Sequence, residues 1–240
     1  MSGVQRVVVV VPARNEEALL GRCLASIARA AGHARDRRPQ ARVDLVVALD
    51  GCTDRSEGIA RAAGAAVVTG NWGTAGGARH AAVLAAGAAG PRTWIASTNA
   101  DTAVPRHWLT GHLAAAQGGA ELLAGTVEPD PADVAPGALR RWRARHRLEE
   151  GHPHVHAANL GVRADVYAAC GGFRPVPHGE DALLLARARA LGHRVLATDR
   201  VRVLTSGRRS GRVADGFAGY LRALEPGAFP PAAPWTSLGA

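Results

Sequence analysis

The chain has 240 residues, 47% of them hydrophobic and 4% aromatic, with a formal net charge of +9 at pH 7, which suits one α/β domain with a core of Ala, Val and Leu. Its three cysteines show no CxxC pattern, which excludes a disulfide framework and a zinc ribbon. No apolar run reaches the roughly 18 residues of a membrane span, so a cytoplasmic protein is expected.

Strands and helices alternate over residues 1–127. Apolar runs typical of buried strands occupy 6–11, 43–49, 65–70 and 92–98, and helical patterns follow at 15–30, 54–64, 76–90 and 105–117. Asn15 is expected to cap the first helix. Alternation of this kind predicts crossover connections and a mainly parallel sheet.

The pattern is looser over residues 128–224. We expect a loop at 128–137, an Arg-rich helix at 138–151, a strand running into a short helix from 154, a helix at 180–192 and a strand at 193–199. The tail, 225–240, is Pro-rich and should be irregular. The sequence therefore predicts a single α/β domain over 1–224, followed by this tail.

Polar residues follow three of the predicted strands, at the point where each strand ends. Each has a simple explanation as a turn or capping residue, but ligands of open parallel sheets bind at the carboxyl ends of the strands. Together these residues predict a binding site: Pro12, Arg14 and Glu16 after the first strand, Asp50 after the second, and Asn99 and Asp101 after the fourth.

The type of ligand is partly constrained by missing motifs. No GxGxxG follows the first strand, and a chain without Lys cannot form a P-loop. The Gly-rich segment 73–80 either brings Arg79 close to a phosphate or makes a tight entry to the third helix. All 29 basic residues are Arg, which suits diphosphates, although a biased composition explains the excess equally well.

Six segments, in order, resemble the motifs of family 2 glycosyltransferases. They are "VVVVVPARNEEALLGRCLASI", "VVALDGCTDRSEGIA", "GTAGGARHAA", "STNADT", "AANLGVRADVYAACGGF" and "GEDALLLARARALGHRV". The resemblance covers about residues 6–200 and implies a GT-A fold, with a Rossmann-like, mostly parallel sheet flanked by helices. It also implies a nucleotide-binding half, 1–127, and a mixed acceptor and catalytic half, 128–224.

The resemblance implies a nucleotide-sugar donor, with a UDP-sugar favoured, and an unknown acceptor. Pro12–Glu16 would line the base pocket, and Asp50 would hold the base or ribose. The implied donor-binding residues are Pro12, Ala13, Arg14, Glu16, Asp50, Gly76, Arg79, Asn99, Ala100 and Asp101.

The metal motif of the family, Asp-x-Asp, falls on Asn99-Ala100-Asp101. The resemblance implies that Asp101 ligates Mg²⁺ or Mn²⁺, and the neutral Asn99 implies weaker binding or partial replacement by Arg. Where relatives place a His, segment 205–212 offers Arg208, Arg209 and Arg212, unless these form a solvated basic loop.

For the acceptor side, the resemblance implies that His156 and Asn159 bind the acceptor and that Glu180 and Asp181 are catalytic. Asp181 would be the general base of an inverting hexosyltransferase. From the residues alone, the two carboxylates could simply complement the dipole of the helix that they open.

The sequence also permits other functions. The altered metal motif permits a catalytically weak or inactive nucleotide-sugar-binding protein. Three alternating histidines, His152, His154 and His156, permit a metal-dependent hydrolase, although no carboxylate or Cys lies beside them. Residues 139–147, with Trp142 among arginines, permit a nucleic-acid binder, but such a helix is more often a solvated face, so no nucleic-acid partner is expected.

Overall fold

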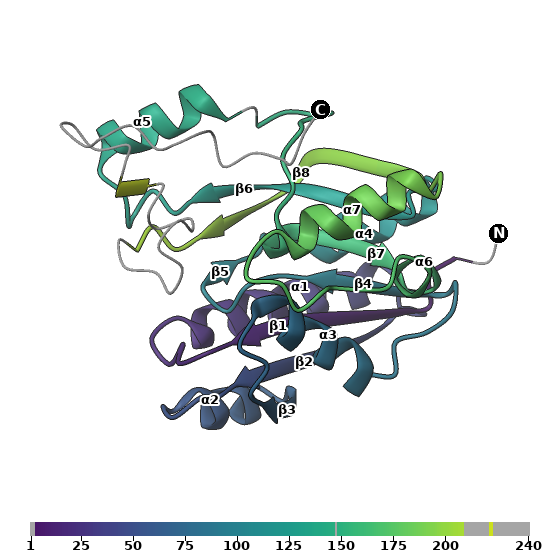
Figure 1. Ribbon diagram of the computed structural model, residues 1–240, viewed down its shortest axis with the longest axis horizontal. Coiled ribbons are helices and arrows are strands. Elements are labelled where there is room, and N and C mark those ends of the chain that lie inside the picture. Colours follow the sequence, from purple (N-terminus) through teal and green to yellow (C-terminus); the bar gives the residue numbers. More distant parts are fainter. Residues whose placement is uncertain (1–2, 147, 209–220, 223–240) are drawn as a thin grey trace.

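The computed structural model describes residues 3–146, 148–208 and 221–222 (Figure 1). The strands are β1 (Arg6–Ala13), β2 (Arg42–Asp50), β3 (Ala66–Gly70), β4 (Thr93–Ser97), β5 (Thr102–Ala103), β6 (Leu122–Pro129), β7 (Leu160–Arg163) and β8 (Val195–Thr205). The helices are α1 (Leu20–Arg37), α2 (Ser56–Ala62), α3 (Ala75–Ala85), α4 (Trp108–Gln117), α5 (Pro136–Arg145), α6 (Ala164–Ala169) and α7 (Glu180–Ala190), with a short 3₁₀ turn at Ala157–Asn159.

The described strands form one sheet in the order β3-β2-β1-β4-β7-β6-β8-β5. The first four of these strands run parallel. In the second half, β7 is antiparallel to both β4 and β6, β8 is parallel to β6, and β5 is antiparallel to β8. The predicted α/β class, with a mainly parallel first half and a mixed second half, is confirmed.

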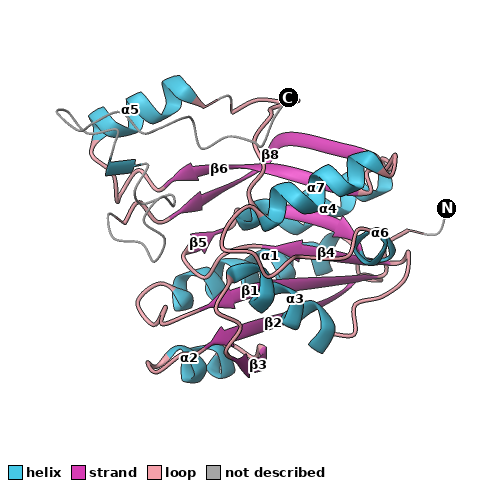
Figure 2. Cartoon of the chain, viewed as in Figure 1, coloured by secondary structure: helices cyan, strands magenta, loops and turns pink. Residues whose placement is uncertain are grey.

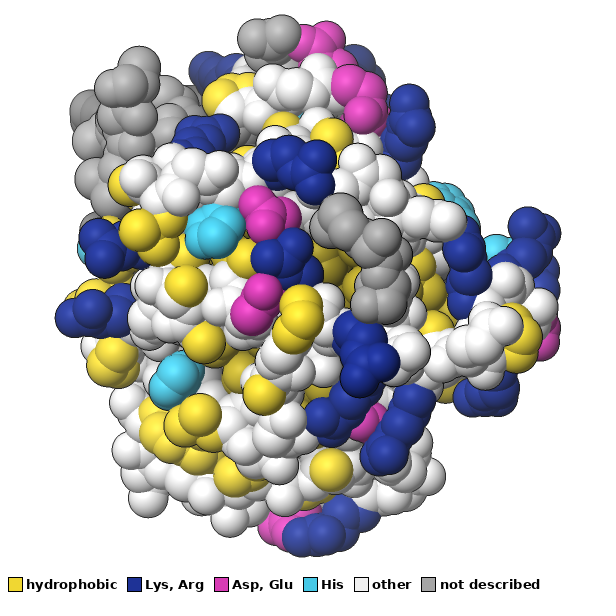
Figure 3. All heavy atoms as spheres, turned by 90° about the vertical axis from the view of Figure 1, so that its right-hand side faces the viewer, with side chains coloured by type: hydrophobic (Ala, Val, Ile, Leu, Met, Phe, Trp, Pro, Cys, Tyr) yellow, Lys and Arg dark blue, Asp and Glu magenta, His cyan; other side chains and the backbone are white. Residues whose placement is uncertain are grey.

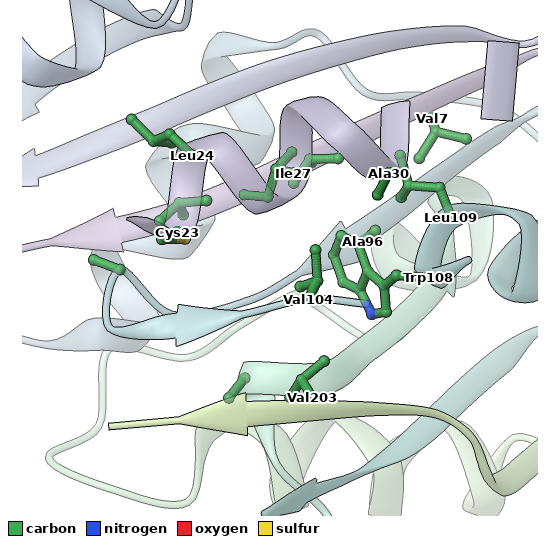
Figure 4. Close-up of a cluster of buried hydrophobic side chains, with 14 of the residues drawn as sticks. Val7, Cys23, Leu24, Ile27, Ala30, Ala96, Val104, Trp108, Leu109 and Val203 are labelled. Atoms are coloured by element: carbon green, nitrogen blue, oxygen red, sulfur yellow. The ribbon is translucent and has the colours of Figure 1, made fainter. Parts of the chain in front are cut away.

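Helices cover both faces of the sheet (Figure 2). The five valines of β1 are fully buried, because alternate side chains of a central strand point to opposite faces and both faces are covered. Val7, Val9 and Val11 pack with α1, α2 and α4, and Val8 and Val10 with α3, α6 and α7. Figure 4 shows the first layer, where α1 meets Trp108 and Leu109 of α4.

The first helix differs from its prediction. It begins at Leu20 rather than at residue 15, and Asn15 adopts a left-handed conformation with φ of 50°. Asn tolerates this conformation better than most residues. Asn15 is therefore a turn residue between β1 and α1, and the prediction that it caps the helix is wrong.

The other differences lie mainly in the second half. β6 runs to Pro129, across the start of the loop predicted at 128–137, and β8 extends six residues beyond the predicted end at 199. β6 is buried along its whole length, so it lacks the alternation of a half-exposed strand. The division at residue 127 stays a prediction, and the tail at 225–240 lies outside the described residues. None of the described helices is long and apolar enough to cross a membrane.

Candidate active site

A cavity of about 280 Å³ lies at the carboxyl ends of β1, β2 and β4. It is lined by Pro12, Ala13, Arg14, Glu16, Asp50, Gly73, Thr74, Ala75, Ala78, Arg79, Asn99, Ala100, Asp101, Pro177 and Arg208. Every residue of the expected donor site except Gly76 is in this lining. Sequence reasoning missed Pro177, which carries no motif. It singled out the Gly-rich segment 73–80 but did not assign the individual lining residues Gly73, Thr74, Ala75 and Ala78.

The turn after β1 is tied to the turn after β2. Asn15 accepts a hydrogen bond from the backbone N–H of Thr53 at 2.8 Å, and its own N–H donates to Cys52 Sγ at 3.3 Å. The N–H of Glu16 donates to Ser56 Oγ at 2.9 Å. These bonds hold Glu16 at the cavity, which explains why Asn15 is needed in the turn rather than in the helix.

The backbone that follows β3 fixes the side chain of Asp50. Its Oδ1 accepts hydrogen bonds from the N–H groups of Trp72 at 2.6 Å and Gly73 at 3.0 Å. Its Oδ2 lies 3.8 Å from Nη1 of Arg14. One oxygen thus fixes the chain after β3, and the other faces Arg14 at the cavity.

Arg79 is a buried cation at the back of the cavity. It lies on α3, which Thr74 caps by accepting from the N–H of Gly77 at 3.1 Å. Its Nη1 donates to Glu180 of α7, and its Nη2 donates to Asn99 Oδ1 at 2.5 Å. Within the described part of the chain, Nε of Arg79 has no hydrogen-bond acceptor. Arg79 therefore joins the strand-end residue Asn99 to the start of α7.

Arg208 reaches the cavity from the segment after β8. Its guanidinium donates to both carboxylate oxygens of Glu16, each at 2.8 Å, and Nη2 lies 2.9 Å from Asp101 Oδ2. Burial raises the pKa of Asp101, while the charge of Arg208 opposes that shift. Of the arginines expected near the site, Arg208 is present there, and Arg209 and Arg212 lie outside the described residues.

Asp181 lies in the first turn of α7, beside the cavity lining rather than in it. Its Oδ2 accepts from the N–H of Ala157 at 2.7 Å, and its Oδ1 accepts from the N–H of Ala182 at 2.8 Å. Burial, and then the neighbouring charge of Glu180, raise the pKa of Asp181. The carboxyl therefore takes up a proton more readily than an ordinary Asp.

Gly76 serves the site through close packing. A Cβ at this position would lie 2.2 Å from the carbonyl oxygen of Arg174 and 3.0 Å from Cβ of Glu180. Only glycine allows α3 to approach the chain before α7 this closely. Gly76 thus sets the spacing between Arg79 and Glu180 instead of lining the cavity.

The two expected acceptor residues are not brought to the cavity. Asn159 is fully buried: its Nδ2 donates to the carbonyls of Thr126 at 2.8 Å and Val201 at 2.9 Å, and its Oδ1 accepts from Trp108 Nε1 at 2.9 Å. Burial lowers the pKa of His156 to about 3. In this structure, Asn159 connects β6, β8 and α4.

The histidines of segment 152–156 are buried and stack on one another, with ring centroids 5.7 Å apart for His152 and His154 and 6.2 Å for His154 and His156. No group of three His, Cys, Asp or Glu side chains among the described residues could hold a metal ion. The ligand set of a His-ligated hydrolase is therefore not formed there.

The Arg-rich helix α5 does not present its aromatic side chain. Trp142 is 1% exposed and packs with Leu221, and Arg143 pairs with Glu128 at 2.6 Å. On the face shown in Figure 3, basic side chains occur at several places with acidic ones beside them. Trp142 is therefore not available to stack on nucleic-acid bases.

Comparison with solved structures identifies proteins with a similar fold. S. aureus TarS 1–349 in complex with UDP-GlcNAc has a TM-score of 0.63 at 16% identity, over 91% of this chain and 65% of that one. A longer TarS chain has a TM-score of 0.63 at 17% identity, over 84% of this chain and 36% of that one. Glucosyl-3-phosphoglycerate synthase from Mycobacterium tuberculosis, in complex with Mn²⁺, uridine-diphosphate and phosphoglyceric acid, has a TM-score of 0.57 at 20% identity, over 92% and 77%.

The chain thus spans about a third of the longer TarS chain and about two-thirds of the shorter one. Identities this low show the fold alone, which is the GT-A fold of these glycosyltransferases. No curated protein matches the sequence. The model of the family described as glycosyl transferase family 2 matches residues 8–173, more than half of the chain. By the extent of that match, the chain belongs to glycosyl transferase family 2.

Proposed function

We propose that this protein transfers a hexosyl group from a nucleoside diphosphate sugar, with UDP as the favoured nucleotide, to an acceptor hydroxyl. The observation that carries the proposal is the cavity at three strand ends, whose lining combines Arg14, Arg79 and Arg208 with three carboxylates. Membership of family 2 supports sugar transfer from a nucleotide sugar. The UDP and UDP-GlcNAc complexes of the TarS structures support the choice of UDP.

In the proposed complex, the base and ribose lie against Pro12–Glu16 and Asp50. The Oδ2 of Asp50 then accepts a hydrogen bond from the nucleoside, because Oδ1 is already occupied by two backbone N–H groups. The diphosphate lies toward Asn99 and Asp101. Arg79, which lines the cavity beside Asn99, adds positive charge at this end of the site.

We further propose that Asp181 is the general base. Its carboxylate would take the proton of the acceptor hydroxyl while that oxygen attacks the anomeric carbon and the bond from that carbon to the diphosphate breaks, which inverts the configuration. The raised pKa of Asp181 supports this role, because a base is most effective when its pKa approaches the working pH. The N–H groups of Ala157 and Ala182 would orient the carboxylate.

A divalent cation, Mg²⁺ or Mn²⁺, would have one carboxylate ligand in the family position, Asp101. Mg²⁺ commonly binds through one or two carboxylates together with substrate phosphates, so Asp101 would hold such a cation only if its Oδ2 turned away from Arg208. The cation would neutralise charge on the departing diphosphate. Asn99 would contribute little to cation binding, because its side-chain oxygen already accepts a hydrogen bond from Arg79.

Thermal-shift measurements with UDP, GDP, dTDP and CDP, each with Mn²⁺ and with EDTA, test donor binding. A ligand at about 100 times its dissociation constant adds roughly 2.7 kcal/mol to the stability of the folded state. Asp50→Asn should weaken binding roughly tenfold, whereas Asp36→Asn, on the exposed surface of α1, should not. If none of the four nucleotides shifts the melting temperature in either buffer, the proposed function is wrong.

Release of the nucleotide from its sugar donor distinguishes an enzyme from a binding protein. We expect slow hydrolysis of the matching nucleotide sugar even without the acceptor, because water can take the place of the hydroxyl. Binding without any release would instead favour the catalytically inactive nucleotide-sugar-binding protein.

A further inference from the structure

Arg208 joins the turns after β1 and β4 to the segment after β8. Glu16 and Asp101, the residues that it contacts, are largely buried, with side chains 5% and 14% exposed. The segment itself is anchored, since the N–H of Ser206 donates to the carbonyl of Asp101 at 2.9 Å. Arg208 therefore has a defined position at the cavity.

The described lining of the cavity carries no surplus of positive charge. Arg14, Arg79 and Arg208 face Glu16, Asp50 and Asp101, and Glu180 also pairs with Arg79. A diphosphate adds at least two negative charges, so its binding requires a cation that can contact its oxygens. Among the described residues, the candidates for that cation are the three arginines, and a metal ion from solvent is the alternative.

Arg208 is the arginine best placed for this task. Arg79 is buried and committed to Glu180 and Asn99, and Arg14 stands on the Asp50 side. Arg208 is one-third exposed and lies against Asp101, the carboxylate that the family pattern assigns to the cation. A guanidinium has five N–H donors, and the contacts with Glu16 and Asp101 use three. Two donors therefore remain for phosphate oxygens without loss of these contacts.

We propose that Arg208 supplies the positive charge that holds the diphosphate of the donor, so that donor binding does not require a divalent cation. This inference rests on the proposed function. Its two remaining N–H groups, one on Nε and one on Nη1, each donate a charge-assisted hydrogen bond to a phosphate oxygen, while the contacts with Glu16 and Asp101 hold the guanidinium in place. It also stabilises the charge that develops on the diphosphate as the sugar leaves.

The test is isothermal titration of the full chain with whichever of UDP, GDP, dTDP and CDP binds, in Mn²⁺ and in EDTA. Wild type should bind equally well in both buffers. Arg208→Ala should bind about tenfold to a hundredfold more weakly in EDTA, the usual effect of losing charge-assisted hydrogen bonds. Arg200→Ala, which removes an exposed arginine of β8 that does not line the cavity, is the matched control and should bind like wild type.

Added Mn²⁺ shows whether Arg208 acts through its positive charge or only as a structural contact. Arg208→Ala removes the cation beside Asp101, so Mn²⁺ should restore much of the nucleotide affinity of this variant. The nucleotide affinity of Arg208→Lys in EDTA should lie between those of wild type and Arg208→Ala. Electron paramagnetic resonance of free Mn²⁺ should show binding to Arg208→Ala and much weaker binding to wild type. The melting temperature of each variant reports whether it is folded.

Two results would overturn the inference while the proposed function stands. One is a wild type that binds its nucleotide only with Mn²⁺. The other is an Arg208→Ala variant that binds nucleotide like wild type in EDTA. A loss of nucleotide affinity in this variant that neither added Mn²⁺ nor the Arg208→Lys substitution reduces would count in the same way. Absence of binding by any of the four nucleotides in either buffer would instead contradict the proposed function itself.

Discussion

At the scale of single residues, the site depends on which oxygen of each carboxylate is already occupied. Asp50 commits Oδ1 to the backbone after β3 and leaves Oδ2 toward Arg14. Asp181 uses one oxygen for Ala157 and one for Ala182. Such backbone bonds fix a carboxylate without neutralising it. The fold itself therefore holds these two carboxylates in place.

Asp181→Asn tests the general base at this scale. We expect kcat to fall by about 10²- to 10⁴-fold, because the amide cannot accept the proton, whereas nucleotide affinity stays unchanged. In wild type, kcat/KM should fall as the pH falls through the raised pKa of Asp181, above the ordinary value of 3.8 for Asp. Stopped-assay rates from pH 4 to 8 would show this acid limb.

Asp181→Asn should lack this fall in kcat/KM at low pH. The control Asp165→Asn, near the opposite end of β7, should keep both the wild-type rate and the wild-type pH dependence. Asp165 pairs with Arg163 outside the cavity lining. A wild-type kcat in Asp181→Asn would show that Asp181 is not the general base.

At the scale of elements, the site depends on how closely α3 and α7 approach. Arg79 on α3 pairs with Glu180 on α7, and Gly76 permits the approach. Both helices lie on the same face of the sheet (Figure 1). The spacing between these two helices therefore sets the distance from Arg79 and the proposed donor-binding cavity to Asp181.

Gly76→Ala tests this spacing. The added methyl group would lie 2.2 Å from the carbonyl oxygen of Arg174, so the chain before α7 has to move. We expect a loss of about 1–3 kcal/mol in the free energy of unfolding, as for overpacking in a core, together with lower kcat. Urea denaturation and initial rates measure the two effects.

Gly58→Ala in α2 is the matched control. A Cβ there would meet nothing within 4 Å. This substitution should be neutral or should stabilise the protein by roughly 0.4–1 kcal/mol, because it reduces the freedom of the unfolded chain. Equal effects of the two substitutions would show that the contact with Arg174 does not matter.

At the scale of the whole molecule, several ionisable groups are buried in the layers that join the sheet to its helices. His112 of α4 is fully buried, its Nδ1 accepts from Trp94 Nε1 at 3.1 Å, and burial lowers its pKa to about 3. Between the ordinary value of 6.5 and this value, the unfolded chain holds a proton that the folded chain does not. His112 therefore makes the folded state less stable as the pH falls through that window.

His112→Asn tests this linkage. Between pH 6 and pH 4, the loss of unfolding free energy per pH unit should be smaller in the variant by about 1.4 kcal/mol, the effect of one proton. Asp101 and Asp181, whose pKa values are raised, contribute with the opposite sign in both proteins, so they cancel in the difference. Urea denaturation over this pH range measures it, with exposed His178→Asn as control. Parallel curves for wild type and His112→Asn would contradict the assignment.

The sequence alone determined the alternation of strands and helices, the strand ends that carry polar residues, and the family. These features depend on local periodicity and on short motifs, which a linear chain displays directly. The valine run of β1 shows a strand covered on both faces, and Asp50 and Asp101 mark the edge where ligands of parallel sheets bind.

Only the tertiary structure decided which polar residues are committed elsewhere. Arg208 contacts Glu16, which lies 192 positions away in the chain. The side-chain amide of Asn159 forms all its hydrogen bonds with β6, β8 and α4. No local pattern reports such partners, because they depend on how distant segments pack. The roles of Asp181 and Asp101 stay predictions, since each depends on a ligand as well as on the fold.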